Sequence, residues 1–445
     1  MKKLLIVAYL FPPTATTGVH RAAKFVKYIG EFGWQVTVIT ADNRVTLAQD
    51  NSLCTDFPDD LRVIKIASFE RTVVQRYIDH ALGFFRLRDL VGEAVAWRLG
   101  RFYRNREIPD QHAPWGRQAS KRAVKLFESE SFDAVLTTSW PYSDHLVGLA
   151  LMEKFGTPWI ADFRDPWIGN SNYQRPEESV IGKAERRLER DIVNSSSAVL
   201  GVTDHMVATF RESYPEIIRS HFKLVRNGYD LDDLPRVNSI VKTAPLIIAF
   251  VGSFYRNRSP LVMIKALSKL SLKGIACSDI QVVFVGGMGG HDCLFEEYSV
   301  DGYCQTLGYQ PAKECYRLIA DCHALWFQST DEDNFAVPGK VYEYMAMNKT
   351  IIASVPKNTE TMEILHKAGS VFQVDPENYL VLADVIYDLV VRKKTENLSC
   401  ERDSGYVEQF SRREQTKNLA GILDEICNDN KVENNILIDL KIKEY

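Results

Sequence analysis

The chain has 445 residues, of which 45% are hydrophobic and 25% are charged, and its formal net charge is −4. This length exceeds one ordinary hydrophobic core and predicts two domains of a soluble globular protein. The slightly acidic balance gives no electrostatic reason to bind nucleic acid. The eight cysteines include no Cys-x-x-Cys pair and no zinc-site spacing, so no metal site is expected.

The chain begins with a short apolar run, Lys3–Tyr9, which ends in Pro12-Pro13 without a small-residue cleavage site. The short apolar run and the two prolines that follow it therefore predict a first buried strand and not a signal peptide. No run approaches the ~20 apolar residues of a membrane span. We expect a cytoplasmic protein with, at most, a peripheral contact at the inner face of the cell membrane.

A β-loop-α-β unit opens the first half. A loop containing Gly18 is followed by a predicted helix over Arg21–Phe32 and a strand over Gln35–Thr40. The order is typical of a doubly wound sheet, but the loop lacks Gly-x-Gly-x-x-Gly and gives no sign of a dinucleotide site. His20 and Arg21 belong either to a ligand-facing loop or to a solvated helix start.

Residues 84–125 combine aromatic side chains with an excess of basic ones. From Arg86 to Lys125 there are ten Lys or Arg against four Asp or Glu. Such a segment is suited to an anionic membrane surface. A plain solvated face is the main alternative, and nucleic-acid binding has no accompanying fold motif.

Polar residues follow two further predicted strands of the first half. Ser139 ends the strand from Asp133, and a helix containing His145 comes next. The strand from Trp159 ends in three charged residues, Asp162, Arg164 and Asp165. The carboxyl ends of parallel strands border the crevice where such sheets bind ligands. An ion-paired structural cluster is the alternative for these charges.

The second half restarts the same pattern after a polar, proline-containing linker over 236–245. Leu246–Gly252 and Gln281–Gly287 are predicted buried strands. Arg256 and Arg258 follow the first of them on a strand-to-helix loop. Guanidinium groups there are well placed to pair with a diphosphate, and exposed loop arginines are the alternative.

The segment Ser329–Ser354 predicts an acidic loop, a helix beginning at Pro338 and a buried strand. The helix N-terminus would lie at the carboxyl edge of a parallel sheet, where free backbone N–H groups favour a phosphate. Glu343, one turn into the helix, can accept two hydrogen bonds from the vicinal hydroxyls of a ribose. Together these features suggest a nucleotide, with a solvated surface glutamate as the alternative.

The stretch VPGKVYEYMAMNKTIIAS resembles the donor-nucleotide segment of family-4 glycosyltransferases, and Ser139–His145 and Asp162–Trp167 resemble acceptor-side segments of bacterial members. The resemblance implies a retaining enzyme of surface-polysaccharide type with the GT-B fold, an α/β architecture of two Rossmann-like doubly wound domains facing across a cleft. It also implies these boundaries: an acceptor domain over 1–235, the linker 236–245, a donor domain over 246–409, a helix over 410–427 that crosses back, and a tail over 428–445.

The resemblance further implies transfer of a sugar from a nucleotide sugar to an acceptor hydroxyl of a glycan or lipid-linked precursor, without another cofactor. Phe335 stands where the family usually has a second glutamate, so nearby acidic residues are candidates for that carboxylate. The implied donor contacts are Gly252, Arg256, Arg258, Lys340 and Glu343; the implied acceptor-side residues are Gly18, His20, Arg21, Ser139, His145 and Arg164; and the candidate catalytic carboxylates are Asp162, Asp165, Glu332 and Asp333.

Two other functions fit the same segments. One is a nucleotide-sugar epimerase of this fold. The other is a non-catalytic partner subunit that binds a nucleotide sugar, which the phenylalanine at position 335 keeps open.

Overall fold

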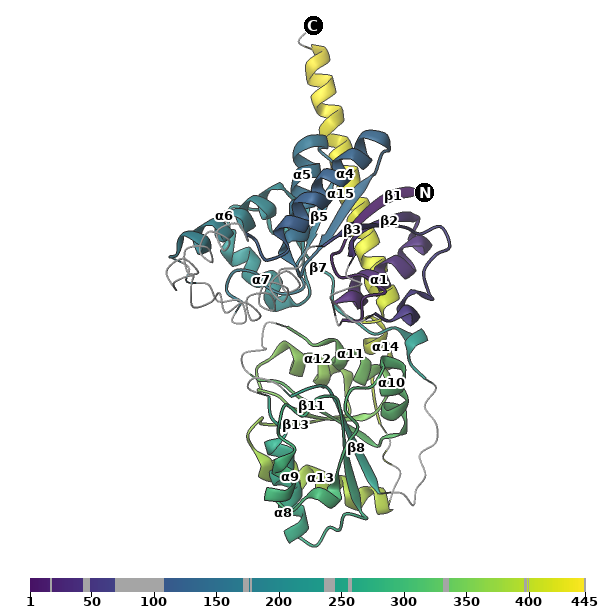
Figure 1. The fold of residues 1–445 in the computed structure, drawn as a ribbon, viewed down its shortest axis with the longest axis vertical. Helices are drawn as coiled ribbons and strands as arrows, with labels where there is room; N and C mark the ends of the chain where they lie inside the picture. Colours follow the sequence, from purple (N-terminus) through teal and green to yellow (C-terminus); the bar gives the residue numbers. More distant parts are fainter. Residues whose placement is uncertain are drawn as a thin grey trace, which may run out of the picture. The chain divides into compact units, whose positions relative to one another are not determined.

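The computed structural model (Figure 1) describes most of the chain, namely residues 1–16, 18–42, 49–68, 108–170, 176, 178–235, 245–254, 258–330, 336–395, 398 and 400–443. The chain divides into two compact units. The first contains Met1–Arg226 and Gln415–Tyr445, and the second contains Asn227–Glu414.

The first unit is built on a seven-stranded sheet in the order β3-β2-β1-β4-β5-β6-β7, with every neighbouring pair parallel. Its four central strands are mostly apolar and buried because helices cover both faces. The strands of the sheet are β1 (Lys2–Val7), β2 (Trp34–Asp42), β3 (Arg62–Ala67), β4 (Ala134–Thr138), β5 (Trp159–Asp162), β6 (Ala198–Gly201) and β7 (Phe222–Leu224).

Two groups of helices cover this sheet, and the apolar side of each helix faces the strands. One face carries α1 (Val19–Ile29) and α15 (Arg412–Lys443), which lie side by side in Figure 1 and share a core that includes Phe25, Ile29 and Leu423. The other face carries α4 (Ala113–Ser129), α5 (His145–Phe155), α6 (Val180–Ser195) and α7 (Asp204–Ser213). The last helix, predicted to end near Cys427, continues to Lys443.

The second unit repeats the architecture with a six-stranded parallel sheet in the order β10-β9-β8-β11-β12-β13. Its strands are β8 (Leu246–Val251), β9 (Ile280–Val285), β10 (Cys304–Thr306), β11 (Ala324–Gln328), β12 (Thr350–Ser354) and β13 (Val371–Val374). Its helices are α8 (Leu261–Leu272), α9 (Cys293–Glu297), α10 (Ala312–Asp321), α11 (Gly339–Ala346), α12 (Glu360–Ala368), α13 (Tyr379–Thr395) and α14 (Ser404–Glu408). The prediction of two doubly wound α/β units is confirmed.

The boundary between the units falls after Arg226 and not at residue 235. Gly228 packs against the carbonyl of Phe410, where an added Cβ would overlap with the oxygen. The N–H of Tyr229 donates to the same carbonyl at 3.2 Å, and the N–H of Arg412 donates to the carbonyl of Tyr229 at 2.7 Å. These bonds tie the segment after Arg226 to the second unit.

Within the ranges that the structure describes, no helix is both long and apolar enough to cross a bilayer.

Candidate functional site

Both sheets have a topological switch point, where the chain winds outward in opposite directions from two adjacent strands. In the first sheet it lies between β1 and β4, and in the second between β8 and β11. Doubly wound sheets bind ligands at the carboxyl ends of these strands. In the second unit, the residues that follow them are Gly252 after β8 and the segment leading into α11 after β11.

The backbone after β8 packs tightly against the backbone after β9. The N–H of Gly252 donates to the carbonyl of Val285 at 2.8 Å, and the N–H of Gly287 donates to Ser253 Oγ at 3.0 Å. Gly286 has φ +125°, and a Cβ there would overlap with the Gly252 carbonyl. At position 286 only glycine fits both the positive φ and the close Gly252 carbonyl. The two loops therefore leave backbone exposed at the sheet edge.

Helix α11 presents a polar side toward this edge because its apolar residues are used in the core. Val341, Tyr344 and Met345 are buried, whereas Glu343 remains partly exposed. Pro338 has extended backbone (ψ 141°) and is the N-cap, so the helix begins at Gly339, one position later than predicted.

Glu343 is held by a residue of a neighbouring helix. Tyr316 of α10 donates its phenol hydrogen to Glu343 Oε1 at 3.0 Å. Burial raises the pKa of the Glu343 carboxyl, while the hydrogen bond from Tyr316 and the charges of Lys340 and Arg412 oppose the rise. The carboxyl group therefore has one fixed hydrogen bond and further acceptor positions available to a ligand.

Two cations accompany Glu343 at the same edge. The ammonium of Lys340, one turn before Glu343 on α11, lies close over the backbone of Gly252, because a Cβ on that glycine would be 2.8 Å from Lys340 Nζ. Burial lowers the pKa of Lys340; the charge of Glu343 raises it and that of Arg258 lowers it. Together with the amino end of α11, these groups form a site that favours an anion.

Three of the predicted site residues lie outside the described ranges. They are Arg256, Glu332 and Asp333, and Phe335 lies there too.

In the first unit, Arg21 and Asp162 form a buried ion pair. Arg21 Nε and Nη2 each donate to one oxygen of Asp162 at 2.8 Å, and the two side chains are only 2% and 0% exposed. Thr138 also donates to Asp162, at 2.7 Å, and Arg21 donates to the carbonyls of Val225 and Arg226. This arrangement matches the structural alternative considered for these charges, since both groups are fully engaged by the protein.

Arg164 and Asp165 lie at the same carboxyl edge but are partly exposed. Arg164 Nη1 donates to the carbonyl of Gly18, the N-cap of α1, so the two predicted residues are in contact. Burial raises the pKa of Asp165, and the charge of Arg164 opposes the rise. Close by, the fully buried Asp144 accepts a hydrogen bond from the N–H of Tyr9 at 2.8 Å.

The other predicted acceptor-side residues differ in accessibility. His20 is partly exposed in the first turn of α1. Ser139 is buried, and its N–H donates to the carbonyl of Asp162 at 2.9 Å. His145 is fully buried, with Nδ1 at 2.7 Å from Thr137 Oγ1. Burial lowers the pKa of His145 to about 3, so it is a neutral core residue at neutral pH.

The buried imidazole predicts a loss of stability in acid. Since the pKa of His145 is about 3 in the folded chain and near 6.5 when exposed, only the unfolded chain gains this proton below pH 6.5. From pH 7.5 to 5.5 the free energy of unfolding should therefore fall by about 1 kcal/mol more in wild type than in His145→Gln. Denaturant titrations at both pH values measure this. His205→Gln, at an exposed position, should keep the wild-type response, and an equal response in His145→Gln would contradict the prediction.

Sequence reasoning missed the residues that surround Glu343 from other elements. Tyr316 reaches it from α10, and Arg412 and Asp233 are close enough to shift its pKa. No spacing rule links these positions, because the pairing depends on how the helices pack. Nothing in the local sequence of α10 marks Tyr316 as a partner of Glu343.

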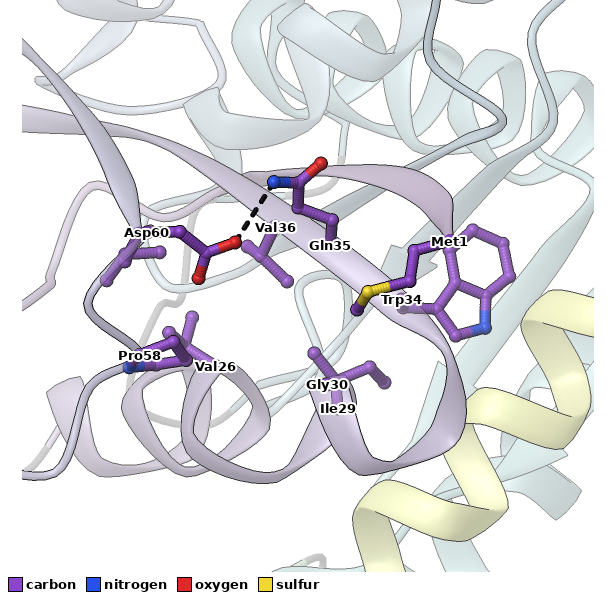
Figure 2. A pocket seen from close by; sticks show the side chains of 10 residues that line it. Met1, Val26, Ile29, Gly30, Trp34, Gln35, Val36, Pro58 and Asp60 are labelled. Atoms are coloured by element: carbon purple, nitrogen blue, oxygen red, sulfur yellow. Dashed lines mark hydrogen bonds between the residues drawn. The ribbon is translucent and has the colours of Figure 1, made fainter.

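A small surface pocket lies at the opposite edge of the first sheet (Figure 2). Met1, Val26, Ile29 and Trp34 line it, and Gln35 Nε2 donates to Asp60 Oδ2 at 3.0 Å beside it. Because β1 and β2 begin here, the pocket is separated from the residues at the carboxyl ends of the strands.

Comparisons with known proteins agree with this architecture. Residues 17–228 match the family model described as a glycosyl transferase 4-like domain, and residues 245–391 match the one described as glycosyl transferases group 1. A search of curated proteins found no match.

Several solved structures share the fold. A glycosyltransferase from Rickettsia africae ESF-5 is 16% identical with a TM-score of 0.62, covering 96% of this chain and 98% of that one. Anabaena Alr3699/HepE, in complex with UDP and glucose, is 14% identical with a TM-score of 0.62, covering 95% and 100%. Sucrose-phosphate synthase from Thermosynechococcus elongatus is 13% identical with a TM-score of 0.57, covering 100% of both.

At these identities the structural likeness establishes the fold, while the two family matches identify the domains. One match spans most of the first unit and the other spans the strands of the second. Residues 17–228 therefore resemble a glycosyl transferase 4-like domain, and residues 245–391 resemble the glycosyl transferases group 1.

Proposed function

We propose that this protein transfers a sugar from a nucleotide sugar to an acceptor hydroxyl and that its second unit binds the donor. The observation that carries the proposal is the position of the Lys340 ammonium over Gly252 at the switch point of the second sheet, within reach of the charges of Glu343 and Arg258. Cations next to exposed backbone suit a diphosphate, and a carboxylate one turn away suits the hydroxyls of a ribose. The structure of HepE, a complex with UDP and glucose, supports a nucleotide of this kind.

The chemistry assigned to these groups is the stabilisation of a departing nucleoside diphosphate. Negative charge grows on the phosphate as the bond to the sugar breaks, and fixed cations in a partly buried site stabilise that charge strongly. Lys340 and Arg258 supply these positive charges, and Arg256 is a further candidate. We propose retention of the anomeric configuration, with Glu332 or Asp333 as the carboxylate near the sugar.

On the acceptor side, the accessible groups of the first unit are the better candidates for substrate contact. Asp165, Arg164 and His20 are partly exposed, whereas Asp162 and Arg21 are buried against each other. We propose that the first three face the acceptor and that the buried pair supports the loops that carry them.

We propose a glycan or lipid-linked acceptor of the kind used for surface polysaccharides, handled at the cytoplasmic side of the membrane. Within residues 84–125, only 108–125 are described, and there α4 exposes a basic side. It is formed by Arg117, Lys121, Arg122 and Lys125. Vesicle binding with and without anionic lipid tests whether this side contacts a membrane.

The proposal predicts that a nucleotide sugar raises the thermal stability of the protein. A ligand that binds only the folded chain stabilises it by about 2.7 kcal/mol when present at 100 times its Kd. We expect a clear rise in melting temperature with one or a few nucleotide sugars in a panel, and a smaller rise with the matching free sugar. A panel in which no nucleotide sugar changes the melting temperature would contradict the proposal.

Product analysis separates the alternatives. An epimerase would convert the stabilising nucleotide sugar to its epimer without any acceptor. A transferase would use an acceptor hydroxyl to form a glycosidic bond to the sugar and would release the nucleoside diphosphate. A non-catalytic subunit would bind the donor and yield neither product.

A further inference from the structure

Tyr316 offers a single, fixed hydrogen bond to the candidate ribose-binding carboxylate. Its ring is partly buried and packs against the apolar core between α10, α11 and the sheet, and its hydroxyl lies 3.0 Å from Glu343 Oε1. A packed tyrosine has few rotational freedoms, so the position of its hydroxyl is set by the fold. The direction of this hydrogen bond therefore fixes one oxygen of Glu343.

The remaining acceptor capacity of Glu343 fits a vicinal diol. A carboxylate offers about four lone-pair positions on its two oxygens. Among the residues that the structure describes, the phenol uses one on Oε1, which leaves Oε2 and a second position on Oε1 for two hydroxyl donors. A 2′-deoxy nucleotide can supply only one of these donors.

The groups around Glu343 act on its ionisation in opposite directions, since the charges of Lys340 and Arg412 lower its pKa and the charge of Asp233 raises it. Lys340 lies on the same helix, Tyr316 and Cys315 approach from α10, Asp233 from the short 3-10 helix Leu231–Asp233, and Arg412 from the start of α15. Burial raises the pKa of the carboxyl, and the phenol hydrogen bond lowers it. Removal of the phenol hydroxyl therefore favours the protonated acid, which is a poorer acceptor.

We propose that Tyr316 is a positioning residue that orients the Glu343 carboxylate toward both ribose hydroxyls and so makes the donor site selective for ribonucleotides over 2′-deoxyribonucleotides. This inference rests on the proposed function, because it takes Glu343 as the ribose contact. It adds a residue on another helix and a ligand preference that depends on it.

The first test needs no ligand. NMR titration of ¹³C-labelled glutamate, with Glu343→Gln used to assign the signal, measures the pKa of Glu343 in wild type and in Tyr316→Phe. We expect a higher pKa in Tyr316→Phe. The matched control is Tyr303→Phe, which removes a hydroxyl that donates to the carbonyl of Ile275 at 2.7 Å in the same unit. This control should leave the pKa of Glu343 unchanged. An unchanged pKa in Tyr316→Phe would overturn the positioning role.

The second test is calorimetric titration with UDP, GDP and ADP and their 2′-deoxy counterparts at several pH values. For the nucleotide that binds wild type, we expect Tyr316→Phe to weaken the ribonucleotide about tenfold and the 2′-deoxy form much less, since a hydrogen bond to a charged group is lost. As the pH is lowered, Tyr316→Phe should also lose binding at a higher pH than wild type does.

The outcomes distinguish the two hypotheses. If wild type binds none of these nucleotides, the proposed function fails and the ribose preference fails with it. If wild type binds one of them but Tyr316→Phe keeps the same affinity, 2′-deoxy ratio and pH profile, only the role of Tyr316 is wrong. Tyr303→Phe should bind like wild type in either case.

Discussion

Replacing Asp162 with alanine is expected to lower the free energy of unfolding of the first unit by about 3–5 kcal/mol, because it leaves a buried charge without its partner. Arg21 is 2% exposed, and two of its nitrogens donate to the Asp162 carboxylate at 2.8 Å. Without that carboxylate, its charge stays in a site that water does not reach. Denaturant unfolding followed by tryptophan fluorescence measures the loss, since Trp159 lies in the core of this unit.

A double-mutant cycle isolates the pair from general packing effects. Asp162→Ala should cost much less when Arg21 is already methionine, because no buried charge then remains. The control is Asp424→Ala, which breaks the Lys2–Asp424 ion pair of the same unit at 2.7 Å, with side chains 38% and 47% exposed. An exposed pair should contribute less than about 1 kcal/mol. Additive costs of the Arg21 and Asp162 changes would contradict the assignment.

The same pair shows where sequence reasoning stopped. Asp162 follows an apolar run that predicted β5, and Arg21 begins a helix whose apolar spacing predicted α1. Both elements are local patterns, and the structure has both. The two residues are far apart in sequence, and only the parallel pairing of the strands brings them together. A charged residue at the end of a predicted strand therefore indicated the edge of the sheet. It did not indicate whether that residue binds a ligand or forms a buried ion pair in the core.

On the donor side, two of the candidate residues could be predicted together because they lie on one short segment. Lys340 and Glu343 are one turn apart on α11, so a single strand-loop-helix pattern placed both near the carboxyl edge. The hydrogen bond from Tyr316 and the charge of Arg412 come from α10 and α15, and no local pattern encodes them. The boundary between the units falls after Arg226 and not at residue 235 for a similar reason. The segment after Arg226 is fixed by hydrogen bonds to Phe410 and Arg412, which are distant in sequence.

Replacing Glu343 with alanine is expected to reduce kcat/KM for sugar transfer roughly 100-fold, since two hydrogen bonds to a charged acceptor together contribute about 3 kcal/mol. The side chain is one turn into α11, and its mutation removes no apolar core contact. Glu363→Ala, at an exposed position of α12 in the same unit, should retain wild-type activity. Initial rates with the donor identified by the thermal panel measure both variants, and circular dichroism checks that each is folded.

Nucleoside and phosphate binding should separate the roles of Glu343 and Lys340. If Glu343 binds the ribose, Glu343→Ala should weaken the nucleoside and its diphosphate by a similar factor. Lys340→Met should weaken the diphosphate strongly and the nucleoside little, because its ammonium lies over the Gly252 backbone where a phosphate would approach. The charge of Lys340 also opposes the raised pKa of Glu343, so the nucleoside comparison is made over a range of pH values, because a higher pH favours the ionised carboxyl in both proteins. Equal losses of nucleoside and diphosphate affinity in Lys340→Met would show that this lysine acts through Glu343 and not on the phosphate.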